Sequence, residues 1–175
     1  MFRVCTFEES VRVPPNLFGM KISDAALRVL RDSYERTVNR DYGVVISVPD
    51  AKVRGEGRII QGDGAAYFDC EFDALVYTPK VNEVVEGEVT EIVEFGAFVR
   101  IGPIDGLVHV SQIADDYLTY DKKTGMLVGK ESKKTVKKGD WVRAKVATVS
   151  MKDTILNSKI ALTMRPAGLG KVTEK

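Results

Sequence analysis

Five short runs of alternating apolar and polar residues follow one another after residue 83, and they constrain the fold more than any other feature. Alternation with a period of two is typical of β-strands that bury one face. Turn residues such as Gly102-Pro103 and Gly139-Asp140 separate the runs. Five strands in about 80 residues favour a small closed all-β barrel. The runs are 84–93, 95–101, 106–113, 141–149 and 159–165.

A long polar stretch separates the third run from the fourth. Residues 114–139 are rich in Lys, Asp and Gly and show no sustained alternation. We interpret them as an insertion into the barrel, with a short hairpin around Tyr120–Leu127.

The first half of the chain mixes strands with one helix. After a strand-like start, Pro14 and Pro15 impose a loop, because proline lacks an N–H and has a fixed φ. A helix is predicted next, with Ser23 as its cap and Gly43 as its end. Its apolar positions recur at helical spacing, at Leu27, Leu30, Tyr34 and Val38.

Strands are expected to follow this helix. They cover 44–48, 58–61 and 68–77, with a turn at 55–57 and a hairpin tip at 62–64. This order predicts an α+β domain, a small antiparallel sheet with one helix, similar to a truncated ribonucleoprotein-like fold. Pro79 then breaks the pattern, so we predict a boundary near Pro79–Glu83 and two domains, 1–80 and 81–175.

Residues able to hold a metal or perform catalysis are sparse. Cys5 and Cys70 lie far apart, and His109 is the single histidine, which excludes a zinc site built from Cys and His. No compact carboxylate cluster, phosphate-binding loop or Ser/Cys–His constellation is present. We therefore expect no metal, no cofactor and no intrinsic enzymatic activity. Lacking an apolar run of about 20 residues and a secretory signal, the chain is expected to be cytoplasmic.

Two phenylalanines of the second run are candidate RNA-binding residues. A regular strand places Phe95 and Phe98 on opposite faces, but Gly96 permits a bulge that turns both outward. Exposed rings stack on unpaired bases of any sequence. The alternative is that one or both rings fill the barrel interior.

His109 is predicted to be accessible. Val108 and Val110 occupy the buried face by alternation, which leaves the imidazole outside to stack on a base or donate to a phosphate. An ordinary surface histidine is the alternative. Basic side chains that could line a phosphate backbone are Arg143, Lys145 and Lys159.

The second half resembles the S1 (S-one) RNA-binding domain, a barrel of the oligonucleotide-binding (OB) fold. The resemblance rests on V-x-G-x-V at Val85–Val89, followed by FGAFV, DGLVHVSQI and KKGDWVRAKV. It implies that Phe95, Phe98 and His109 form a stacking patch with Lys159 as its basic neighbour. Ser150 stands where many members have an acidic residue.

The whole chain resembles the E-prime subunits of archaeal RNA polymerase, counterparts of the seventh subunit of eukaryotic RNA polymerase II. The segments VRVPP-N-x-FG and DGAAYFDCEFDALVYTP and the insertion after SQI carry this likeness. It implies a non-catalytic stalk subunit that forms a heterodimer with the F subunit of the polymerase, contacts the core polymerase subunits and binds nascent single-stranded RNA during initiation and elongation.

The E-prime resemblance also implies a polymerase-docking tip in the first domain. Its residues are Pro15, Asn16, Phe18, Gly19, Gly62, Asp63 and Gly64. The alternative is that both segments are ordinary loops, which prolines and glycines form equally well. Leu75, Tyr77 and the insertion are candidate contacts for the F subunit. The alternative that remains open is a stand-alone translation factor or RNA chaperone with the same barrel. A ribonuclease with an accessory barrel is a second rival, but the sequence argues against it because no catalytic constellation is present.

Overall fold

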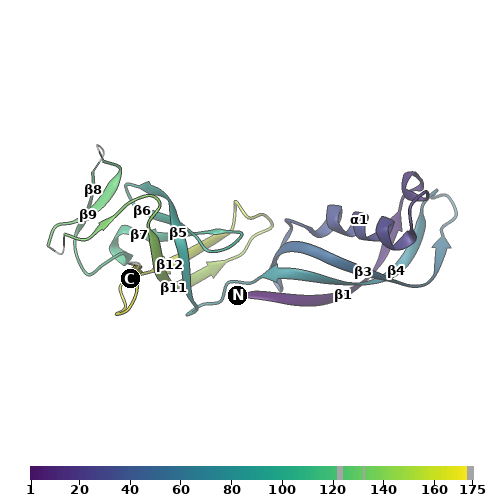
Figure 1. Ribbon diagram of the computed structural model, residues 1–175, viewed down its shortest axis with the longest axis horizontal. Coiled ribbons are helices and arrows are strands. Elements are labelled where there is room, and N and C mark those ends of the chain that lie inside the picture. The colour runs from purple at the N-terminus through teal and green to yellow at the C-terminus, as the bar shows by residue number, and fades with distance from the viewer. Residues whose placement is uncertain (122–123, 132, 173–175) are drawn as a thin grey trace. The chain divides into compact units, whose positions relative to one another are not determined.

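The computed structural model describes residues 1–121, 124–131 and 133–172. The chain divides into two compact units, Met1–Thr78 and Pro79–Lys175, so the division falls at the proline that breaks the strand pattern. Figure 1 shows the elements of both units. Each unit has its own sheet and its own buried interior, and each is described separately below.

The first unit is an antiparallel four-stranded sheet in the order β1-β4-β3-β2, with one helix on one face (Figure 1). β1 and β4 pair along their whole length, with Phe7 opposite Phe72. Burial of Leu30 and Phe72 at the helix–sheet contact stabilises the unit by about 1.5–3 kcal/mol for each side chain. The elements are β1 (Phe2–Val13), η1 (Pro15–Leu17), α1 (Ile22–Tyr34), β2 (Val38–Asn39), β3 (Gly43–Ile59) and β4 (Ala66–Tyr77).

The helix is shorter than the sequence predicts. Its N-cap is Lys21 rather than Ser23, and it ends at Tyr34 because Arg36 adopts a left-handed φ of 67°. Val38, predicted as a helical residue, instead begins β2, in keeping with the preference of β-branched residues for strands. Gly43 does not end the helix as predicted but begins β3. Glycine is needed there because a Cβ would lie 2.2 Å from the carbonyl oxygen of Tyr77 on the neighbouring strand.

The prediction of a turn at 55–57 is also wrong. β3 continues through this segment as one strand, and its register against β4 shifts between Arg54 and Arg58. Gly55 takes a φ of 70°, and Gly57 leaves room for the ring of Phe68. The glycines therefore allow an irregularity within the strand and do not reverse the chain.

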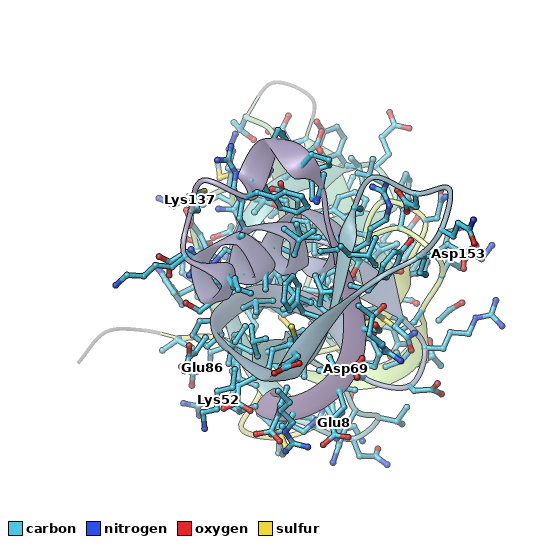
Figure 2. All side chains as sticks on the ribbon, turned by 90° about the vertical axis from the view of Figure 1, so that its right-hand side faces the viewer. Glu8, Lys52, Asp69, Glu86, Lys137 and Asp153 are labelled. Atoms are coloured by element: carbon cyan, nitrogen blue, oxygen red, sulfur yellow. The ribbon has the colours of Figure 1, made fainter. Side chains whose placement is uncertain are left out.

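The open face of this sheet, on the side away from α1, divides into a charged part and an apolar part. Arg54 pairs with Glu8 at 2.8 Å and also with Glu71, and Arg58 pairs with Asp69 at 2.7 Å. Figure 2 labels Glu8 and Asp69 on this face. Toward the other end of β1 the outward residues are apolar, with Phe2 57% and Val4 66% exposed.

The second unit is a closed five-stranded barrel, as the sequence predicts. Its strands follow the order β12-β7-β6-β5-β11, and β12 closes the barrel by pairing parallel to β7 and antiparallel to β11. Val89, Val108 and Leu162 are among the buried inward residues. The strands are β5 (Val84–Val93), β6 (Gly96–Arg100), β7 (Asp105–His109), β11 (Trp141–Ser150) and β12 (Lys159–Thr163).

The insertion forms a three-stranded sheet in the order β10-β9-β8. Tyr120 pairs with Leu127, so the predicted hairpin corresponds to β8 and β9, although residues 122 and 123 of its turn lie outside the described part of the chain. The remaining elements of this unit are η2 (Val110–Gln112), β8 (Leu118–Asp121), β9 (Met126–Gly129), β10 (Thr135–Val136) and β13 (Gly170–Lys171).

Candidate nucleic-acid interface

Phe95 and Phe98 lie together on the outside of the barrel. The ring of Phe95 is 51% exposed and Phe98 is half-buried. Their centroids are 6.5 Å apart and their planes meet at 82°. Neither ring fills the interior, whose positions on this strand belong to Ala97 and Val99.

The outward position of Phe95 does not come from a bulge at Gly96, as the sequence suggests. Phe95 precedes β6, in the tight turn after β5, and its carbonyl accepts a hydrogen bond from Val110 at 2.9 Å. The register shift lies in β5, between Val89 and Glu91. Gly96 has another role, because a Cβ there would lie 2.2 Å from the carbonyl oxygen of Val108. This glycine therefore permits the close approach of β6 and β7.

His109 ends β7 and is exposed, as predicted. Its Nδ1 accepts a hydrogen bond from the Ser111 N–H at 3.3 Å and lies 2.9 Å from the Ser111 hydroxyl, so the imidazole caps η2. This cap fixes the ring orientation, and no sequence signal pointed to it. Val110, predicted to be buried, is half-buried because the strand stops one residue earlier.

The strand register builds one outward row across four strands. Phe98 is opposite Leu107, Leu107 is opposite Ala161, and Ala161 is opposite Thr148. The row is apolar near Phe98 and has small side chains farther away. Such a surface suits flat bases, which stack on the ring and lie against the apolar residues.

Two of the three predicted basic residues border this row. On the β11–β12 pair, Lys145 is opposite Thr163 at one end and Lys159 is opposite Ser150 at the other. Arg143 differs, because it faces Glu86 of β5 and binds its carboxylate at 2.6 Å. The Glu86 carboxylate offsets the charge of Arg143, which weakens the case for a phosphate contact there.

An open groove beside Phe98 was not predicted. It has a volume of about 470 Å³ and lies between β5, β6, the β6–β7 turn and the β11–β12 loop. Arg100 lines it and is 3.9 Å from the Asp105 carboxylate. Alternation along β6 could have identified Arg100, because it lies two residues after Phe98 and shares its face.

The predicted tip residues of the first unit lie together. A Cβ on Gly64 would be 3.7 Å from Pro15 Cγ, which brings the two loops to one end of the sheet. Pro15 and Asn16 form part of η1, and Gly19 is exposed after it. Phe18 is 53% exposed, and Gly62 adopts a φ of 92° that only glycine takes readily.

Asp63 holds this tip in one conformation. Its carboxylate accepts two hydrogen bonds from Arg12, at 2.7 and 2.8 Å, one from the Tyr67 hydroxyl at 2.7 Å and one from the Ala65 N–H at 3.1 Å. The bonds from Arg12, and then those from Tyr67 and Ala65, hold the pKa of Asp63 well below its usual range. The same contacts raise the pKa of Arg12 and Tyr67. Arg12, which the sequence did not single out, is therefore central to the tip.

Over residues 1–121, 124–131 and 133–172, no group of three or more His, Cys, Asp or Glu side chains could hold a metal ion. No helix in the same ranges is long and apolar enough to cross a bilayer.

Comparison with known proteins covers both units. Residues 78–159 match the S1 RNA binding domain, and residues 8–64 match the SHS2 domain found in the N terminus of Rpb7p/Rpc25p/MJ0397. Among solved structures, RNase R of Mycoplasma genitalium in complex with ribose methylated single-stranded RNA is similar over 47% of this chain and 13% of its own, with 27% identity and a TM-score of 0.42.

Two curated relatives extend over most of the chain. The DNA-directed RNA polymerase II subunit rpb7 of Dictyostelium discoideum is 24% identical over 83% of this chain and 86% of its own. The DNA-directed RNA polymerase subunit Rpo7 of Sulfolobus acidocaldarius is 46% identical over 98% of this chain and 93% of its own. The resemblance drawn from the sequence is therefore confirmed, and the chain belongs to the family of archaeal DNA-directed RNA polymerase subunit Rpo7, with a C-terminal S1 domain.

Proposed function

We propose that this polymerase subunit performs no chemistry of its own and binds nascent single-stranded RNA on the outside of its barrel. The observation that supports this most is the pair of exposed rings, 6.5 Å apart, on an S1 barrel. Phe95 and Phe98 stack on bases, His109 adds a third flat ring, and Lys145 and Lys159 attract phosphates. Stacking and charge let the barrel bind transcripts of any sequence, because every base has a flat π-face.

The proposed consequence is support of transcription in initiation and elongation. RNA held on the barrel is less free to slip, so processivity rises. Run-off transcription by polymerase reconstituted with and without this subunit tests the idea, with abortive and full-length products counted separately. Equal product distributions in both reactions would refute it.

A stand-alone translation factor remains the rival interpretation of an S1 barrel. Affinity purification from native extract separates the two. Our proposal expects the large catalytic polymerase subunits to co-elute in constant proportion with this chain, whereas a translation factor co-elutes with ribosomes.

We further propose that the tip of the first unit docks into the core polymerase. Phe18 offers an exposed apolar side chain there, and the Arg12–Asp63 pair orders the loop before contact. The tip then loses little conformational freedom when it binds.

Replacing Asp63 with Asn is expected to weaken co-purification with core polymerase while leaving the fold intact, because an amide cannot accept both guanidinium bonds as a carboxylate does. Asp69→Asn makes the same chemical change in a more exposed ion pair away from the tip, with Arg58, and serves as the control. Because the pKa of Asp63 is lowered in the folded chain, its ionised carboxylate stabilises the tip fully above the usual carboxyl pKa of about 4. This stabilisation is lost only when the pH falls through the still lower pKa of the folded state. Docking by the unsubstituted chain is therefore expected to be constant between about pH 5 and pH 8.

The F subunit is proposed to cover the apolar part of the open sheet face. Phe2 and Val4 are more than half exposed there, and Val4 lies opposite Leu75 of β4. The Phe2 ring packs against Tyr77 with centroids 4.9 Å apart, so the patch is ordered before a partner arrives. Aromatic and aliphatic side chains in such patches are typical of the buried centres of subunit interfaces.

Val4→Lys is expected to abolish a stable heterodimer with the F subunit, since it places a charge in the centre of the patch. Thr6→Lys, two residues along the same face and beside Asp73, adds the same charge outside the patch and is expected to be tolerated. Size-exclusion chromatography of the two co-expressed chains gives the readout. Co-elution of the Val4→Lys chain with the F subunit would place the interface elsewhere.

A further inference from the structure

The groove beside Phe98 has the shape and chemistry of a base-reading subsite. Its volume of about 470 Å³ falls within the range of roughly 300–1,000 Å³ typical of small-ligand sites. Phe98 contributes a ring on one side, and Ile155 and Leu156 of the β11–β12 loop contribute apolar side chains on another. Leu156 is 95% exposed, so its side chain is available to cover a ligand.

Glu91 is the polar group placed to meet the edge of a base in this groove. The register shift in β5 sets Glu91, and not Thr90, opposite Phe98. Among the described residues its carboxylate has no hydrogen-bond or ion-pair partner, whereas Asp105 across the groove is 3.9 Å from Arg100. An ionised carboxylate only accepts hydrogen bonds, so Glu91 favours ligand edges that donate them.

We infer that Glu91 reads the hydrogen-bonding edge of the base stacked on Phe98 and favours bases that carry an amino group. This inference rests on the proposed RNA-binding function. Adenine, cytosine and guanine present amino donors on the edges that proteins read in single strands, and carboxylates accept from such groups. Uracil presents a single N3–H donor between two carbonyl oxygens, and these oxygens repel the carboxylate, so uracil pairs with it less well than a base with an amino group. The subsite therefore adds a base preference to a surface that otherwise stacks any base.

Equilibrium binding to short labelled oligonucleotides tests this preference in the full chain. Oligo(C) and oligo(A) are expected to bind about fivefold or more tightly than oligo(U), the lower end of what one well-placed base contact supplies. Glu91→Gln keeps the size of the side chain but adds a donor. The ratio of the affinity for oligo(C) or oligo(A) to the affinity for oligo(U) is therefore expected to fall toward one. Glu88→Gln, three residues earlier on β5 and opposite Arg100, removes the same charge and is expected to keep the ratio.

Each glutamine variant loses one negative charge and is therefore expected to bind every oligonucleotide somewhat more tightly. This general gain cancels in the ratio of affinities for two oligonucleotides, so the two variants can be compared directly. Leu156→Ala is expected to lower affinity for all three oligonucleotides without changing the ratio. Tight binding with no base preference, or a preference that survives Glu91→Gln, would overturn the inference and leave the proposed function standing. Failure of the unsubstituted chain to bind any oligonucleotide would instead overturn the proposed function.

Discussion

Replacing Phe95 and Phe98 together with alanine is expected to weaken binding of single-stranded RNA by about 30-fold or more. Each stacked base contributes about 1–3 kcal/mol, so the loss of two rings removes at least about 2 kcal/mol. Both side chains lie on the barrel surface, and the inward residues of β6 remain unchanged. Fluorescence anisotropy with a labelled oligonucleotide measures the effect. Adding His109→Ala is expected to weaken binding further, because it removes both the third ring and the cap of η2.

Tyr117→Ala provides the control for this double substitution. Its ring is 71% exposed in the insertion and packs with Lys130, so it removes an aromatic surface of similar size from the same unit. Affinity is expected to stay within about twofold of the unsubstituted chain, as for a surface change away from the site. RNA affinity that survives the double substitution would remove Phe95 and Phe98 from the proposed interface.

Phe72→Ala is expected to destabilise the first unit by about 3–5 kcal/mol, as is typical when a buried phenylalanine is truncated. Phe72 is 1% exposed and packs between Phe7 and Tyr34, with ring centroids 5.5 and 5.1 Å away. Since small domains are stable by only about 5–15 kcal/mol, this is a large fraction of the total. Urea denaturation measures this loss of stability. The variant is also expected to dock less well to core polymerase, while its affinity for RNA is expected to persist.

The single tryptophan makes this experiment selective. Trp141 lies in the second unit, so its fluorescence follows the barrel, while far-ultraviolet circular dichroism follows both units. Phe72→Ala is expected to lower the dichroism midpoint and leave the fluorescence midpoint unchanged. Leu162→Ala, which truncates a side chain 1% exposed in the barrel, is expected to move the fluorescence midpoint instead. Coincident shifts of both signals in either variant would mean that the units unfold together.

The sequence predicted the strands well where alternation is strict. The residues of β4 follow the expected alternation from Phe68 to Val76, because the apolar side chains of one face are buried or half-buried in the core while Asp69 and Asp73 of the other face are exposed. The helix end was not predictable from apolar spacing, since Val38 keeps the helical period yet pairs with Val44 in a strand. Tertiary pairing overrides local periodicity at such positions.

The outward placement of the candidate RNA-binding residues was predicted more accurately than its causes. Phe95, Phe98 and His109 are outward as expected, but Phe95 reaches the surface through a turn and not through a bulge. Backbone geometry of this kind depends on the close contact of Gly96 with β7, which no local pattern encodes. Arg143 was expected to line a phosphate backbone, but it pairs with Glu86, and this pairing depends on the register of strands far apart in the sequence.

The right angle between the two phenylalanine rings restricts what kind of RNA the barrel can accept. Bases that stack on Phe95 and Phe98 must themselves be inclined by nearly 82°, so two neighbours held this way cannot lie parallel to each other. Neighbouring bases in an RNA helix are parallel. If the transcript stacks on both rings as proposed, the paired stem of a hairpin must open before its bases are captured, and the barrel and the stem then compete for the same nucleotides.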